Sequence, residues 1–184
     1  MTPFRNANAI TRRVVCAAVI VGLAAPAAAQ ACADQDSAPI LLSTAAASAS
    51  VLCLVNQRRH QAGVPGVSGE RRLAQAARRH SGAMNSRNFF AHNSRGGSPL
   101  SRIQRTGYLA GASDWAIGEN IRWGSGELGT PRAAVASWMA SPPHRETMLS
   151  RRYRQVGVGV AIGSPTSGAG ADAAIYTADF GSRQ

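Results

Sequence analysis

Apolar residues recur with helical spacing in two long segments of the N-terminal half of the chain. The first segment begins near Thr44, and Gly63 and Pro65 end its pattern. Its apolar face consists of Ala47, Val51, Leu54 and Val55. The second segment covers about residues 69–86, and its apolar face consists of Leu73, Ala76, Ala77, His80 and Met84. This spacing predicts two helices, the second with a histidine on its apolar face.

Capping residues predict where helices begin. Ser68 is expected to cap the second helix, with Glu70 in its first turn. Ser98-Pro99 is a favourable start for a short third helix, which ends at Gly107.

Thr130-Pro131 is another capping residue followed by proline and predicts a fourth helix, which stops at Pro142-Pro143. The residues that it is expected to bury are Val135, Trp138 and Met139. Residues 144–149 can form one further turn.

Period-two alternation begins late in the chain. In residues 156–162, valine or isoleucine alternates with glycine or alanine, which predicts a strand. Residues 173–180 form a second strand, residues 163–172 a hairpin loop, and residues 117–123 can form a third strand. Helices followed by neighbouring strands predict an α+β fold with an antiparallel sheet, and not a doubly wound parallel sheet.

The first 29 residues have the pattern of a secretory signal peptide. Three arginines precede an apolar run over residues 14–23, and Ala27-Ala28-Ala29 fits a small-residue cleavage site. The run is shorter than the roughly 20 residues that a membrane span needs. We therefore expect cleavage near Ala29, a secreted protein in the exterior or the periplasm, and no transmembrane segment after cleavage.

The remaining length suits one domain and not two. We expect a flexible lead-in over residues 30–43, followed by a single domain over residues 44–184.

All 20 basic residues are arginines, against nine acidic residues, and the formal net charge is +11. Export, and the lack of aromatic residues interleaved with basic ones, argue against a nucleic-acid partner. A basic exported protein points instead to a small molecule or an anionic cell-envelope ligand. We expect it to be a monomer.

Cysteine usage agrees with export. Cys16 leaves with the signal peptide, and Cys32 and Cys53 remain. In an oxidising compartment these two most simply form one structural disulfide; two unpaired thiols are the alternative.

Two histidines and one glutamate are the best candidates for a site. His92 and His144 each lie where a helix gives way to a loop, a common place for binding residues. Glu119 lies beside Asn120 on a predicted strand, which favours a buried polar role. Each also has an ordinary interpretation as a surface or hydrogen-bonded structural residue, and sequence spacing alone does not unite them.

The other histidines and the tryptophans are assigned to packing or to the surface. His80 is interpreted as a helix-packing residue that can border a cleft, rather than as a ligand, and His60 as a surface residue near a helix end. The tryptophans, expected in the core, are Trp115, Trp123 and Trp138.

Several further motifs follow one another along the chain in the order in which a known family has them. The first comprises Phe89-Phe90-Ala91-His92-Asn93-Ser94, Ser98-Pro99 and Gly107-Tyr108. The second is Gly118-Glu119-Asn120-Ile121. The third comprises Trp138-Met139-Ala140-Ser141-Pro142-Pro143-His144-Arg145, Met148-Leu149 and Val156-Gly157-Val158-Gly159-Val160, and Tyr176-Thr177 and Phe180-Gly181 close the series. Together they resemble the bacterial type of the CAP superfamily (cysteine-rich secretory, antigen 5 and pathogenesis-related proteins, or SCP domains), over about residues 51–181.

The resemblance implies a three-layer α-β-α sandwich with a central antiparallel sheet and an open cleft where His92, Glu119 and His144 converge. Animal and plant relatives usually have a fourth cleft residue, a glutamate three residues after the tryptophan, where this chain has Ser141. This departure removes one negative charge and one possible ligand. Pro143 stands where glycine is commoner, which stiffens the approach to His144.

Two imidazoles and a carboxylate form a plausible ligand set for Zn²⁺ or another divalent cation. We therefore take His92, Glu119 and His144 as candidate metal ligands, and as candidate catalytic residues if there is catalysis. The HExxH helix of zinc proteases and the GxSxG serine motif are both missing from the sequence.

Three functions stay open: a secreted binding module for a divalent metal and a small or anionic extracellular ligand, a metal-assisted hydrolase of envelope or extracellular material, and a lipid or sterol carrier.

Overall fold

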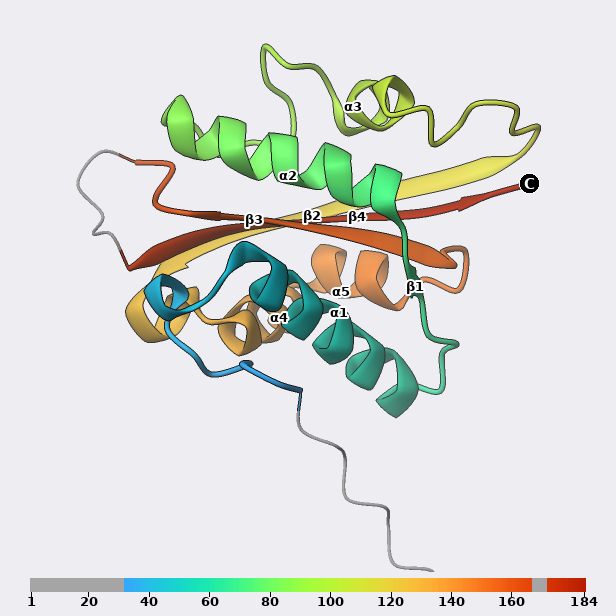
Figure 1. Ribbon diagram of the computed structural model, residues 1–184. Coiled ribbons are helices and arrows are strands. Elements are labelled where there is room, and N and C mark those ends of the chain that lie inside the picture. Colours follow the sequence, from blue (N-terminus) through green and yellow to red (C-terminus); the bar gives the residue numbers. More distant parts are fainter. Residues whose placement is uncertain (1–31, 167–171) are drawn as a thin grey trace, which may run out of the picture.

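The computed structural model describes residues 32–166 and 172–184 (Figure 1). The expected signal peptide, residues 1–29, and five residues of the expected hairpin loop lie outside these ranges. The elements in chain order are η1 (Pro39–Leu41), α1 (Thr44–Gln61), β1 (Ser68–Gly69), α2 (Arg71–Ser86), α3 (Pro99–Arg105), β2 (Trp115–Ser125), η2 (Gly126–Gly129), α4 (Pro131–Ala140), α5 (Pro142–Leu149), β3 (Gln155–Ile162) and β4 (Ala173–Arg183).

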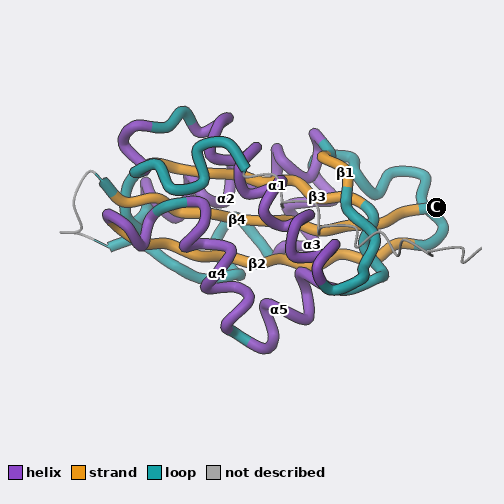
Figure 2. The backbone as a smooth tube through the Cα atoms, turned by 90° about the horizontal axis from the view of Figure 1, so that it is seen from below, coloured by secondary structure: helices purple, strands orange, loops and turns teal. Residues whose placement is uncertain are grey.

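The elements form the predicted α-β-α sandwich. In the view of Figure 1, α2 and α3 lie above the sheet, and α1, α4 and α5 lie below it. The strand order is β1-β3-β4-β2, and both β3 and β2 pair antiparallel with β4. Figure 2 shows β2 along one side of the three long strands. Within the described ranges, no helix combines the length and the apolar character that crossing a bilayer requires.

The start of α2 differs from the sequence prediction. Ser68 does not cap this helix, because Ser68 and Gly69 form β1, which pairs parallel with Gln155 and Val156 of β3. The cap is Glu70, whose carboxylate accepts a hydrogen bond from the backbone N–H of Leu73 at 2.7 Å. Pairing with β3 holds the chain extended up to Gly69, so that Glu70 is the first residue whose side chain can turn back onto the helix.

The other helix starts follow the sequence. Ser98 and Thr130 cap α3 and α4 through their side-chain oxygens, as predicted. Pro142-Pro143 both ends α4 and begins α5, which extends to Leu149 and is longer than a single turn. Proline suits this role, because the first turn of a helix needs no N–H from it.

Two glycines of β3 let α2 approach the sheet closely. A Cβ atom on Gly157 would lie 1.9 Å from the backbone nitrogen of Ala74, and one on Gly159 would lie 2.2 Å from the carbonyl carbon of Ala77. Any side chain at these positions would push α2 outward. The alternation of valine and glycine in β3 therefore sets the depth at which α2, with His80, lies against the sheet.

Most of the core lies between the sheet and the lower helices. Its largest side chain is Trp138, which is 1% exposed and donates a hydrogen bond from Nε1 to the carbonyl of Ile121 at 3.1 Å. Trp123 is half-buried and packs against a smaller cluster that includes Met84. The prediction for Trp115 was wrong, because it lies at the end of β2 and is 41% exposed.

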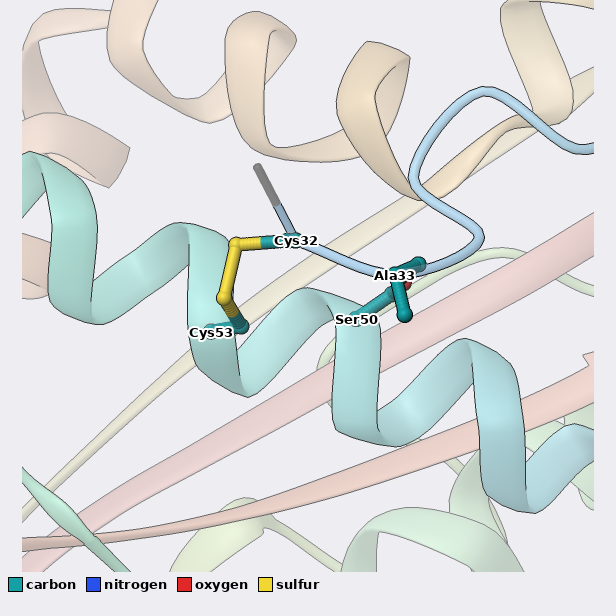
Figure 3. The surroundings of a disulfide bond; sticks show 4 residues. All are labelled: Cys32, Ala33, Ser50 and Cys53. Atoms are coloured by element: carbon teal, nitrogen blue, oxygen red, sulfur yellow. A yellow bond between two sulfur atoms is a disulfide. The ribbon is translucent and has the colours of Figure 1, made fainter. Parts of the chain in front are cut away.

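The predicted disulfide between Cys32 and Cys53 is confirmed (Figure 3). It ties the segment before η1 to the middle of α1, with a Cα–Cα distance of 5.8 Å. Beside it, the hydroxyl of Ser50 donates a hydrogen bond to the carbonyl of Ala33. These links attach the lead-in to the domain.

Candidate functional site

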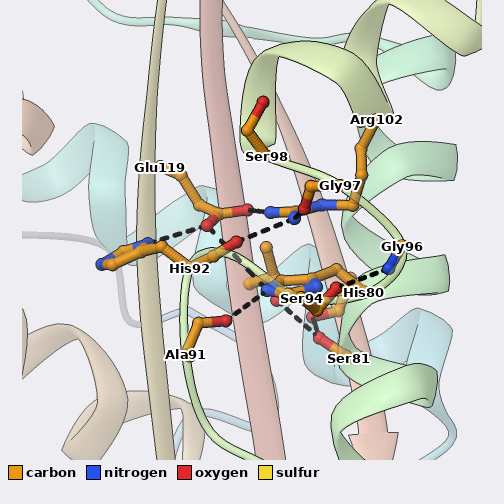
Figure 4. Close-up of polar contacts among 12 residues, drawn as sticks. His80, Ser81, Ala91, His92, Ser94, Gly96, Gly97, Ser98, Arg102 and Glu119 are labelled. Carbon is orange, nitrogen blue, oxygen red and sulfur yellow. Dashed lines mark hydrogen bonds and ion pairs between the residues drawn. The ribbon is translucent and has the colours of Figure 1, made fainter.

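Glu119 is the centre of the polar cluster on the upper side of the sheet (Figure 4). It lies on β2, and its side chain is 2% exposed. Nδ1 of His92 lies 2.8 Å from Oε1, and the guanidinium of Arg102 donates to Oε2. Figure 4 shows His92 and Arg102 approaching the carboxylate from opposite sides. Both carboxylate oxygens are therefore engaged.

These neighbours determine the charge of Glu119. Burial by itself would raise the pKa of this carboxyl group, but the hydrogen bond with His92 and the charge of Arg102 outweigh burial and hold the pKa below its ordinary value. Glu119 is therefore ionised at neutral pH. A buried carboxylate of this kind is stable only while its cationic partner stays in place.

Arg102 supports the site as well as neutralising it. It lies on α3 and is 6% exposed. Its Nη1 donates to the carbonyls of His92 and Gly97, each at 2.8 Å, while Nη2 bonds Glu119. One guanidinium thus holds the backbone of the His92 loop and the carboxylate that contacts the His92 ring.

His80 holds the same loop from the second helix. Its ring is buried on α2, and Nε2 lies 3.0 Å from the carbonyl of Ala91, the residue before His92. Burial is the main cause that lowers the pKa of His80, so the ring is neutral at pH 7. In this form Nε2–H donates to Ala91. The sequence interpretation of His80 as a packing residue that borders the cleft agrees with this position.

A second buried carboxyl group lies beside Glu119 on the neighbouring strand. Asp179 of β4 is the direct cross-strand partner of Glu119 and is fully buried. Neither of its carboxyl oxygens receives a hydrogen bond from the described residues. Burial, and then the negative charge of Glu119, raise the pKa of Asp179 well above its ordinary value, so that a protonated Asp179 can donate to Glu119.

His144 contacts Asn120, the neighbour of Glu119 in β2, from the opposite layer. It lies on α5, below the sheet, and its backbone carbonyl accepts a hydrogen bond from Nδ2 of Asn120 at 2.9 Å. Its Nδ1 lies 2.8 Å from the hydroxyl of Ser141. Burial, and to a smaller extent the charge of His92, lower the pKa of His144.

The polar contacts of the candidate residues therefore lie on both sides of the edge strand β2. Glu119 contacts residues of the upper layer, whereas its neighbour Asn120 contacts the lower layer, as alternation along a strand requires. His92 and Glu119 are in direct contact, and His144 is linked to them through Asn120. Ser141, at the position of the family glutamate, hydrogen-bonds the imidazole of His144 without adding a negative charge.

Sequence reasoning missed two members of this cluster, Arg102 and Asp179. The available signals were weak: an arginine on the inner side of a short amphipathic helix, and an aspartate in an otherwise apolar strand. Neither identifies its partner, because the contacts join residues from different layers.

The predicted metal ligands fit a divalent cation only in part. Among the residues that the structure describes, no three His, Cys, Asp or Glu side chains lie close enough to hold an ion together. Glu119 would have to release His92 or Arg102 to become a ligand. The two histidines fit better, because Nδ1 of each imidazole has a partner and no described residue hydrogen-bonds Nε2.

The α-β-α sandwich is the architecture of SCP domains. Residues 52–180 match the family described as CAP, Cysteine-rich secretory protein family. Since the match covers most of the chain, the chain belongs to this family. It is 33% identical to the uncharacterized protein YkwD of Bacillus subtilis over 136 residues, 73% of this chain and 49% of YkwD. The chain thus spans about half the length of this relative.

Solved structures share the fold. An extracellular SCP-domain protein from Bacillus anthracis has a TM-score of 0.59 and 25% identity, covering 74% of this chain and 40% of its own. An outer surface protein from Borrelia burgdorferi has a TM-score of 0.64 and 16% identity, covering 78% and 97%. A cysteine-rich secretory protein from Staphylococcus aureus has a TM-score of 0.53 and 17% identity, covering 75% and 39%.

Proposed function

We propose that this chain is an exported CAP-domain binding module whose cleft holds a divalent cation, zinc first, on His92 and His144. The cation would attract a small or anionic extracellular ligand. The observation that carries the proposal is the state of the two imidazoles. Each has its Nδ1 engaged, by Glu119 and by Ser141, and no hydrogen bond from a described residue at Nε2.

Glu119 has a positioning role in this proposal. A carboxylate that accepts the Nδ1–H of a histidine fixes the tautomer with a free lone pair on Nε2, the form that binds metals. The side chain of His92 is 46% exposed, so that its outer nitrogen is accessible from solvent. The lowered pKa of His144 favours the neutral ring, which is also the ligand form.

Two nitrogen ligands leave coordination positions for water or for an oxygen of a ligand. A bound cation would supply Lewis acidity at these positions, while the chain orients both imidazoles and keeps Glu119 neutralised. The names of the relatives support export, because one is an extracellular protein and another an outer surface protein.

Calorimetric titration of Zn²⁺ into the metal-stripped protein tests the proposal. We expect one-to-one binding that the double variant His92→Ala/His144→Ala loses and the control His60→Ala, on an exposed histidine, retains. Glu119→Gln should weaken binding about 10–100-fold, as for other carboxylates behind a metal-binding histidine. Equal zinc binding by the double variant and the unmodified protein would refute the site.

The same preparations separate binding from hydrolysis. Turnover of peptide, ester or glycan substrates that stops on chelation and in the double variant would indicate the metal-assisted hydrolase. Zinc binding without such turnover would favour the binding module.

A further inference from the structure

A pocket of 170 Å³ lies between α2 and the segment that leads into α3, on the Arg102 side of Glu119. Four arginines line it, Arg79, Arg87, Arg102 and Arg105, and no acidic residue does. We propose that this pocket is a binding site for the phosphate group of an organic phosphate. It is distinct from the proposed cation site, and it requires neither His92 nor His144.

The shape of the pocket follows from the sequence of α2. Ala76 and Ala83 lie on the same face of α2 as Arg79, and Arg87 follows directly after the helix; all four line the pocket. The small alanines leave space, while the long arginines reach around it. Ser94 lines the pocket opposite the helix and contributes a hydroxyl group.

The four arginines have different partners. The two terminal nitrogens of Arg102 bond Glu119 and two backbone carbonyls, whereas its Nε has no hydrogen-bond partner among the described residues. Arg105 donates only to the carbonyl of Gly96, which leaves its charge uncompensated. Within the described residues, the side chains of Arg79 and Arg87 form neither a hydrogen bond nor an ion pair.

Three cationic side chains without a counter-charge around one small pocket repel one another. A bound oxyanion would reverse this repulsion. A phosphate group matches the forked guanidinium geometry, because its oxygens can accept paired N–H donors from several arginines.

A neighbouring pocket indicates that the ligand carries more than a bare phosphate. This second pocket has a volume of 490 Å³ and shares Arg87 and Ser94 with the first. Phe89 and Ala91 add apolar surface, and Arg95 adds a further cation. A phosphate ester could place its phosphate in the small pocket and its organic group in the larger one.

Binding should be measured with inorganic phosphate, glycerol 3-phosphate and phosphatidylglycerol-containing vesicles, at constant ionic strength and with a chelator present. The pocket variant is Arg79→Gln/Arg87→Gln. Its matched control is Arg78→Gln/Arg152→Gln, which removes the same charge from two exposed arginines, one of them on α2. We expect saturable phosphate binding that the pocket variant weakens about tenfold or more and the control leaves unchanged.

The three probes distinguish the source of the phosphate. Tighter binding of glycerol 3-phosphate than of inorganic phosphate, lost in the pocket variant, supports a free phosphate ester. Vesicle association that only the pocket variant loses supports a lipid headgroup. The absence of saturable binding to every probe, or equal weakening in the pocket variant and the control, would overturn the proposal.

The His92→Ala/His144→Ala variant keeps the two proposals separate. It should bind phosphate normally while losing zinc, so that either site can fail without the other. Loss of phosphate binding in this variant would contradict a separate phosphate pocket.

Discussion

Replacing Arg102 with methionine tests whether the buried ion pair holds the candidate site together. Methionine keeps much of the volume of the side chain and removes its charge and its donors. The substitution leaves the Glu119 carboxylate, 2% exposed, with His92 as its remaining strong partner and with Asp179 beside it. It also removes the donors to the carbonyls of His92 and Gly97.

The expected cost follows from the loss of one partner of a buried pair. Removing one ion while leaving the other buried typically costs about 3–5 kcal/mol. Domains of this size have about 5–15 kcal/mol of stability in total, so Arg102→Met should lower the free energy of unfolding by about a fifth or more.

Urea unfolding at neutral pH, followed by tryptophan fluorescence, measures this change. The control is Arg95→Met, the same substitution at an exposed arginine, which should change stability by less than about 0.5 kcal/mol. Glu119→Gln and the double variant Arg102→Met/Glu119→Gln complete a cycle. The double variant should be more stable than the sum of the single effects predicts, because the uncompensated charge is gone.

Two results would refute this reasoning. A loss below about 1 kcal/mol in Arg102→Met would mean that the carboxylate does not depend on the guanidinium. Strict additivity in the cycle would mean that the two groups do not interact.

Three other perturbations have definite expected outcomes. Trp138→Ala should cost about 3–5 kcal/mol in urea unfolding, because it empties a buried site and leaves the carbonyl of Ile121 without its donor; a cost near zero would place Trp138 outside the core. Because the folded-state pKa of Asp179 is raised above 3.8, its contribution to stability is present below that pH and is lost as pH rises through the folded-state pKa. Asp179→Asn should therefore be more stable than the unmodified protein at pH 7. This advantage in the free energy of unfolding should shrink toward pH 4, by about 1.4 kcal/mol for each unit by which the pKa is shifted. A difference in stability that does not change with pH would contradict this. Reduction of the Cys32–Cys53 disulfide, which spans 21 residues, should cost about 3 kcal/mol in thermal or urea unfolding, whereas Cys32→Ser/Cys53→Ser should be insensitive to reductant.

Much of the fold could be predicted from local patterns. The alternation in residues 155–162, and the caps at Ser98 and Thr130, depend on neighbours close in sequence, and the structure contains the elements that they predict. The strand β1 could not be found in this way, because two residues are too few to show a period. Its pairing with β3 in turn moved the cap of α2 from Ser68 to Glu70.

The burial of the tryptophans could likewise be predicted from the sequence in one case and not in another. Trp138 lies in the last turn of α4, where the spacing of apolar residues predicts its burial. Trp115 lies at the first position of β2, at the edge of the sheet, where no element covers it fully. Residue type alone therefore overestimated its burial.

The sequence by itself determined the order of the longer elements, the cysteines available for the disulfide, the family, and the candidates His92, Glu119 and His144. The elements follow from residue types and short-range spacing, and the family and the set of candidates follow from the resemblance of several motifs in a fixed order; a linear chain displays both directly. Only the tertiary structure decided that Arg102 neutralises Glu119, that Asp179 lies beside it, and that His144 comes from the opposite layer. The physical reason is that the charge state of a buried group depends on neighbours within a few ångströms. In this chain, packing across three layers brings those neighbours together from distant positions in the sequence.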